Sequence, residues 1–102
     1  MAHSSDYHRF HSMPLFSIGA LIFSEGVDRL MREGRLDPMP FFQRHARGDW
    51  GDVSDEAWYA NNVALKNDGQ LDSLYAVTRE LNIRIFTEAD RSATHVLLPS
   101  EF

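Results

Sequence analysis

The chain of 102 residues contains no cysteine. Disulfide bonds and thiolate catalysis are therefore excluded, and a zinc site would have to use histidine and carboxylate ligands alone. Basic residues are in the minority, because 10 Lys and Arg stand against 15 Asp and Glu, for a formal net charge of -5. General binding to a phosphate backbone needs a basic surface, so this balance disfavours nucleic acid as a partner.

The sequence also has no apolar run long enough to cross a membrane. The longest run, Leu15–Phe23, has nine residues and includes a serine and a glycine, whereas a bilayer needs about 20. The N-terminus has no basic start followed by an apolar segment, as a secretion signal would have. We therefore expect a cytoplasmic protein with no membrane partner.

Motifs that identify common enzyme classes are missing as well. There is no Walker loop for phosphates, no glycine-rich dinucleotide turn, no HExxH pair and no nucleophile elbow. Asp49 and Asp52 carry oxygen ligands of the kind that divalent cations prefer, but their spacing is not that of an EF-hand loop. We expect no cofactor and no bound metal.

The apolar content is sufficient for one domain, since 43% of the residues are hydrophobic and 12% aromatic. Residues 1–12 differ from the rest, because they are rich in His and Ser and show no apolar period. They predict a disordered N-terminal extension. Residues 13–102 are expected to form a single domain.

Hydrophobic periodicity predicts an α+β fold, in which an N-terminal strand and three short helices precede a three-stranded antiparallel meander. Ser24 and Ser54 are suited to begin helices, and a glycine follows the end of each helix. The helices are expected to pack on one face of the mostly antiparallel sheet. The expected strands are Leu15–Phe23, Leu71–Thr78, Ile83–Glu88 and Thr94–Leu98. The expected helices run from Ser24 to Gly34, from Asp37 to Gly48 and from Ser54 to Asn67.

His45 is the first candidate for catalysis. It lies one turn before Asp49, near the end of the second expected helix, where the helix dipole and a carboxylate would both favour imidazolium. His45 would then act as a general acid or base. The alternative is that its hydrogen bonds fasten the loop at Gly48.

The loop that follows and the third helix supply candidate binding residues. Asp49 and Trp50 lie between two glycines, and the indole of Trp50 suits a buried anchor whose N–H is hydrogen-bonded. Asn61 falls in the middle of the apolar arc of its helix. A buried amide needs partners, so Asn61 either locks the nearby loop or faces a ligand pocket.

The segment TEADRSAT (Thr87–Thr94) has six polar or charged residues out of eight and lies between two apolar strands. Strand alternation places a file of hydroxyl side chains along one end of the sheet, beside Glu88, Asp90 and Arg91. This arrangement is either a site or a structural device, made of cross-strand hydroxyl pairs and an Arg91–carboxylate bridge. The file consists of Ser73, Tyr75, Thr87 and Thr94.

Two segments resemble a family of small uncharacterised proteins encoded on bacterial plasmids and other mobile elements. They are HARGDWGD (His45–Asp52) and IFTEADRSATHVLLPSEF (Ile85–Phe102). Members typically show GDWG and TEADRS motifs and, between them, an asparagine on a helix and a Ser-x-Tyr strand, here Ser73-Leu74-Tyr75. The resemblance extends over residues 13–102 and departs at His95, where the family often has threonine.

The resemblance implies no established activity. Some relatives carry a label borrowed from restriction–modification methyltransferases, but this chain lacks the glycine-rich cofactor loop and the Asn/Asp-Pro-Pro-aromatic motif of those enzymes. The first hypothesis is therefore a non-catalytic accessory protein of a mobile element, which binds a protein partner through the Gly48 loop and the Glu88–Ser92 hairpin.

Two other functions are compatible with the sequence. The chain would be a small hydrolase such as a ribonuclease if His45 served as acid or base, Glu88 or Asp90 as its partner, and Arg91 as a phosphate clamp. It would be an inhibitor of a host defence system if its 15 acidic residues formed one continuous acidic face that mimics nucleic acid.

Overall fold

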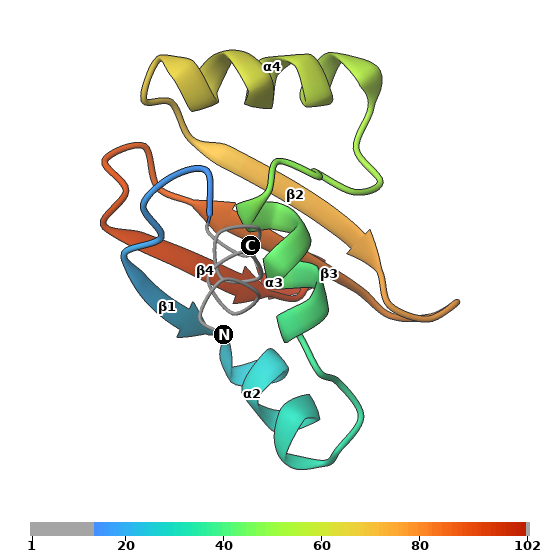
Figure 1. Cartoon of the computed structure of the whole chain (residues 1–102). Helices are drawn as coiled ribbons and strands as arrows, with labels where there is room; N and C mark the ends of the chain where they lie inside the picture. The colour runs from blue at the N-terminus through green and yellow to red at the C-terminus, as the bar shows by residue number, and fades with distance from the viewer. Residues whose placement is uncertain (1–13, 102) are drawn as a thin grey trace, which may run out of the picture.

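The computed structural model describes residues 14–101, which form an α+β fold of three helices and a four-stranded mixed sheet. The predicted extension of residues 1–12 lies outside the described range. Figure 1 shows the sheet with α3 in front of it and α4 alongside strand β2. The elements are β1 (Ala20–Phe23), α2 (Glu25–Arg32), α3 (Met39–Ala46), α4 (Asp55–Lys66), β2 (Leu71–Ala76), β3 (Asn82–Thr87), β4 (Ala93–Leu97) and the short 3-10 helix η1 (Pro99–Glu101).

The sheet has the strand order β1-β4-β3-β2. Strands β2, β3 and β4 pair antiparallel, as the predicted meander requires, whereas β1 runs parallel to β4 and makes the sheet mixed. A parallel pair needs a long crossover connection, and the three helices together with β2 and β3 provide it. The sheet therefore brings Ala20 beside Ala93, far apart in sequence.

The first strand is shorter than predicted, because only Ala20–Phe23 of the expected range Leu15–Phe23 is extended. The amide of Leu15 donates to the carbonyl of Ala46, so the chain first crosses the end of α3. It then turns at Gly19, which has a φ of 70°. The apolar character of the segment reflects packing against the rest of the molecule rather than a single strand.

Helices α2 and α4 begin after the predicted cap residues, whereas α3 begins at Met39, two residues after the expected start at Asp37. The hydroxyls of Ser24 and Ser54 accept hydrogen bonds from the amides of Val27 and Ala57, and so cap α2 and α4. Helix α3 begins beside Pro38, whose ring provides a φ suited to a first helical turn. Local sequence signals thus account for these three starts.

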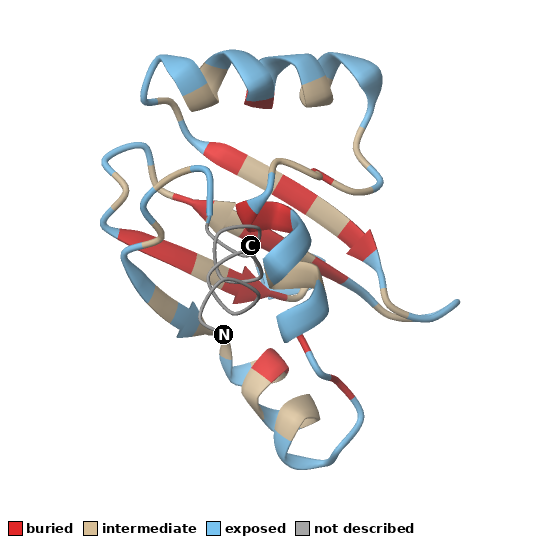
Figure 2. Ribbon diagram, viewed as in Figure 1, coloured by how far each residue is buried: buried red, intermediate tan, exposed pale blue. Residues whose placement is uncertain are grey.

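Buried and partly buried residues alternate along β2 and β3 (Figure 2), so the two faces of the sheet have different environments. The face that we call the inner face carries fully buried side chains such as Ile85 and Val96, and α2 and α3 pack on it through Val27 and Phe41. The opposite, outer face carries Ile22, Leu74, Phe86 and His95. At the level of Arg84 and Leu74, this face borders a groove that is lined by Pro99 of η1 and by Ala57, Ala60 and Asn61 of α4.

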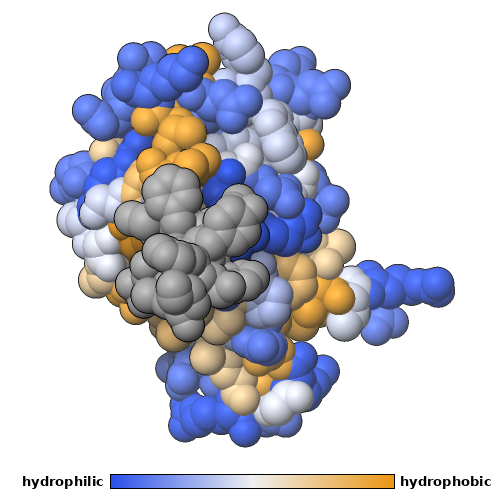
Figure 3. Space-filling view, in the orientation of Figure 1, coloured by the Kyte–Doolittle hydropathy of each residue, from blue (hydrophilic) through white to orange (hydrophobic). Residues whose placement is uncertain are grey.

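Helix α4 does not follow the prediction that all helices pack on one face. It lies along β2 at the edge of the sheet, as Figure 1 shows. Figure 3 shows that hydrophilic residues make up most of the coloured surface on this side of the molecule, with separate apolar patches. Within residues 14–101, no helix has the length and apolar character that a membrane crossing requires.

The turn at Gly19 gives a test of this fold. A Cβ at this position would lie 2.4 Å from the backbone carbon of Ser92, in addition to the strain of a positive φ. Gly19→Ala should lower the free energy of unfolding by about 3 kcal/mol or more. Gly34→Ala is the matched control, because Gly34 has a φ of 71° with nothing within 4 Å, and it should cost only about 1–2 kcal/mol. Urea unfolding of both variants measures the difference, and equal costs would contradict the close approach of β1 and β4.

Candidate functional site

His45 lies at the centre of a buried polar network on the inner face. Its side chain is fully buried and projects from the last turn of α3 toward the sheet. The Nδ1 atom is 2.6 Å from the hydroxyl of Ser73 on β2, and the Nε2 atom is 2.9 Å from the hydroxyl of Thr87 on β3. Both ring nitrogens are therefore hydrogen-bonded within the protein.

The network continues across the sheet to the segment before β1. The hydroxyls of Thr87 and Thr94 are 2.8 Å apart, and Thr94 donates to the carbonyl of Ile18 at 2.8 Å. A hydroxyl has one hydrogen, so Thr94 must accept from Thr87, and Thr87 must accept from Nε2–H of His45. Ser73 then donates to Nδ1. This direction assigns the neutral Nε2–H tautomer to His45.

The surroundings of His45 favour this neutral form. Burial, together with the positive charge of Arg91, lowers the pKa of the imidazole from 6.5 to about 4. The prediction that the helix dipole and Asp49 would favour imidazolium is therefore wrong, since desolvation dominates. The alternative prediction is also incomplete, because the ring of His45 fastens two strands rather than the loop at Gly48.

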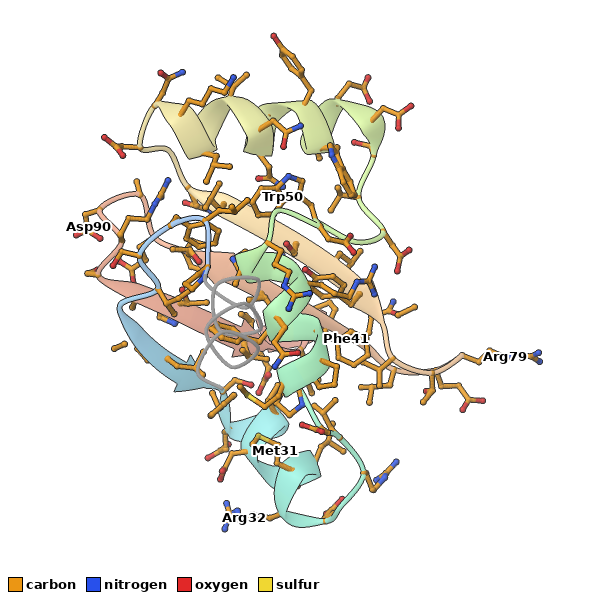
Figure 4. The ribbon with its side chains drawn as sticks, viewed as in Figure 1. Met31, Arg32, Phe41, Trp50, Arg79 and Asp90 are labelled. Carbon is orange, nitrogen blue, oxygen red and sulfur yellow. The ribbon has the colours of Figure 1, made fainter. Side chains whose placement is uncertain are left out.

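Aromatic rings enclose the network. Phe16 and Trp50 each meet the His45 ring edge to face at 5.5 Å between centroids and stack on one another at 6.4 Å. Trp50 is fully buried, and its indole N–H donates to Asn62 of α4. Figure 4 shows Trp50 between α3 and α4. The predicted role of Trp50 as a hydrogen-bonded anchor is confirmed.

Asn61 is a structural lock. Its amide group donates to the carbonyl of Asp72 at 2.8 Å and accepts from the amide of the same residue at 3.1 Å. The side chain thus imitates a neighbouring strand and joins α4 to the edge of β2. The predicted lock was on the nearby loop, whereas the structure places Asn61 as a lock on β2. Asn61 also lines a groove beside Leu74, which agrees with the other predicted role as a pocket residue.

Asp49 and Tyr75 belong to a second polar contact at the end of α3. The Tyr75 hydroxyl donates to the backbone carbonyl of Asp49 at 2.6 Å, and burial raises the pKa of this phenol. The carboxylate of Asp49 accepts from Arg44 at 2.8 Å, and this hydrogen bond lowers the pKa of the carboxyl. Tyr75 and Asp49 therefore stabilise the GDWG loop.

Arg91 holds the end of α4 rather than a carboxylate. Its backbone has a φ of 61°, and its guanidinium donates to the carbonyls of Gly69 at 2.5 Å and Ala64 at 3.2 Å. These carbonyls lie at the C-terminus of a helix, where cations are stabilising. The predicted Arg91–carboxylate bridge is absent from residues 14–101.

The two acidic candidates have other partners. Glu88 lies 2.7 Å from Nε2 of His95, and the side chains on this side of β3 and β4 belong to the outer face. Asp90 is exposed at the tip of the hairpin, where it accepts from the amide of Ser92 (Figure 4). The four predicted catalytic residues therefore do not converge on one cavity. No group of three or more His or acidic residues within 14–101 is arranged to hold a metal ion.

Sequence reasoning missed the residues that complete these contacts. Phe16 and Ile18 were assigned to a strand, and the apolar run gave no sign that a carbonyl would accept from Thr94. Asn62 lies further round the helix than Asn61, so the apolar arc gave no sign that it would accept from Trp50. No family model, curated protein or solved structure matches the chain.

Acidification should weaken the fold through His45. In the unfolded chain its pKa is near 6.5, and in the folded protein it is about 4, so the unfolded state binds a proton more readily. Neutral His45 therefore contributes about 3 kcal/mol to the free energy of unfolding. This contribution is complete above pH 6.5 and is lost as the pH falls toward 4. Urea unfolding between pH 7 and pH 4 measures this loss, and the control His45→Gln should show a shallower decline. Identical declines would contradict the assignment.

The middle of the network can be tested separately. Thr87→Val keeps the shape of the side chain but removes the acceptor for His45 and the donor to Thr94. Leaving these buried groups unpaired should lower the free energy of unfolding by about 1–3 kcal/mol. Thr78→Val, at an exposed position of the β2–β3 turn, should change it by less than about 0.5 kcal/mol. Equal effects in thermal or urea unfolding would show that the buried hydroxyl has no special role.

Proposed function

We propose that the chain is a non-catalytic protein-interaction module, an accessory protein of a mobile genetic element that acts in the cytoplasm. The observation that supports this proposal is how the polar residues are used. His45, Asn61 and Arg91 all bind groups of the protein itself, and within residues 14–101 no buried side-chain nitrogen or oxygen lacks a hydrogen bond. A catalytic site needs groups that are available to a substrate.

Apolar side chains and hollows on the outer face of the sheet also support the proposal. Ile22 is 43% exposed, and Leu74 and Phe86 are half-buried. A hollow of about 240 Å³ lies beside Ile22, Phe86 and Leu97. A groove of about 480 Å³ lies between Leu74 and the alanines of α4. Apolar side chains around such hollows are typical of surfaces that bind other molecules.

The other two functions receive less support. A ribonuclease that uses His45 would need a substrate to reach a fully buried ring whose nitrogens are both hydrogen-bonded. A nucleic-acid-mimicking inhibitor would need a continuous acidic face. Asp49 and Asp72 are instead paired with Arg44 and Arg84, which interrupts such a face.

Cross-linking in cells tests the proposed function. A photoreactive phenylalanine analogue at Leu74, on the outer face, should give a covalent adduct of defined mass with one protein. The same analogue at Arg79 is the control, because Arg79 points away from the body of the molecule (Figure 4), and it should give none. Purified protein should leave RNA intact. RNA cleavage that disappears in His45→Gln would instead establish the hydrolase.

A further inference from the structure

The two edge strands of the sheet, β2 and β1, differ in whether their outward-facing backbone groups are hydrogen-bonded. At the β2 edge, every outward-facing residue has a partner: Asp72 bonds the amide of Asn61, and Leu74 accepts from Asp52 and donates to Trp50. The amide of Ala76 donates to the carboxylate of Asp52. This edge is therefore closed to further strands, which is how proteins avoid unwanted pairing.

The β1 edge is not closed in this way. The amide of Ala20 donates to Ser92, just before β4, and the amide of Ser24 donates to Val96 of β4. Alternation along the strand therefore turns the N–H and C=O groups of Leu21 and Phe23 away from the sheet. Within residues 14–101, no side chain or backbone group is hydrogen-bonded to them. Two donors and two acceptors are thus left in a row along this edge.

The sequence of β1 does not protect the edge. The strand Ala-Leu-Ile-Phe has no charge and no proline, the two devices that most often discourage pairing. On its outer face, exposed Ile22 lines the hollow of about 240 Å³ together with Phe86, His95 and Leu97. The open edge therefore lies beside a space that can receive an apolar side chain.

We propose that the β1 edge binds an extended segment of a partner protein by strand addition, an inference that rests on the proposed function. An alternating row of backbone donors and acceptors is complementary to another extended backbone. Alternate side chains of the added strand would lie beside Ile22 on the outer face, so an apolar residue is favoured there. The net charge of -5 favours a segment that is neutral or basic.

A second copy of the chain fits this edge less well. Pairing of two four-residue strands buries far less than the roughly 1,200 Å² of a stable interface. Both copies would also carry the same negative charge. A short segment of another protein needs neither a large interface nor self-complementarity.

Amide hydrogen exchange by NMR tests the proposal on the full chain. The probe is the neutral blocked peptide acetyl-Gln-Thr-Val-Thr-Val-Thr-Gln-amide at millimolar concentration. Exchange at Leu21 and Phe23 should slow by at least about 10-fold, while exchange at Ala20 and Ser24, whose amides are already hydrogen-bonded, should not change. A peptide with its central backbone nitrogens methylated should have no effect, because it cannot donate.

Two variants complete the test. Ile22→Lys should abolish the protection, because it places a charge at the edge and beside the hollow, whereas Tyr59→Lys, at a 72% exposed position on α4, should preserve it. Three results would each overturn the proposal. They are no protection of the wild-type chain, protection by the methylated peptide, and protection that rises with protein concentration when no peptide is present. If one of these results were found while the photoreactive analogue at Leu74 still formed adducts, the proposed interaction function would stand. Only the assignment of binding to the β1 edge would be rejected.

Discussion

The hydrogen-bonded chain from Ser73 through His45, Thr87 and Thr94 to Ile18 is the interaction on which the rest of the structure depends. It joins α3, three strands and the segment that leads into β1, none of which local sequence signals can bring together. Apolar packing alone would tolerate several registers, whereas buried polar groups must all be paired at once. The network therefore specifies one arrangement of these elements, and its neutral histidine avoids the cost of a buried charge.

The elements themselves could largely be predicted from the sequence. Serine caps, proline at a helix start and alternating strands are local features, and they indicated three helices and the strands of the meander. The parallel pairing of β1 with β4 and the position of α4 at the sheet edge could not be predicted. Both result from contacts between distant residues, such as Asn61 with Asp72 and Gly19 with Ser92.

In the candidate site, too, the contacts between distant residues could not be predicted from the sequence. The sequence identified His45, Ser73, Thr87 and Thr94 as unusual polar residues, and the structure brings all four together. It could not show whether they face solvent or each other, because that depends on how completely Phe16 and Trp50 enclose them. Arg91 illustrates the point further, since a cation among acids predicts an ion pair, but its guanidinium binds backbone carbonyls of α4 and the following loop.

His45 is a neutral structural residue, and nitrogen NMR of its imidazole ring tests this most directly. We expect the Nε2–H tautomer at pH 7, with a hydrogen that exchanges slowly, and a pKa of about 4. A ring that titrates near its ordinary pKa of about 6.5, or that exchanges its proton rapidly with solvent, would contradict the account and restore His45 as a candidate for catalysis.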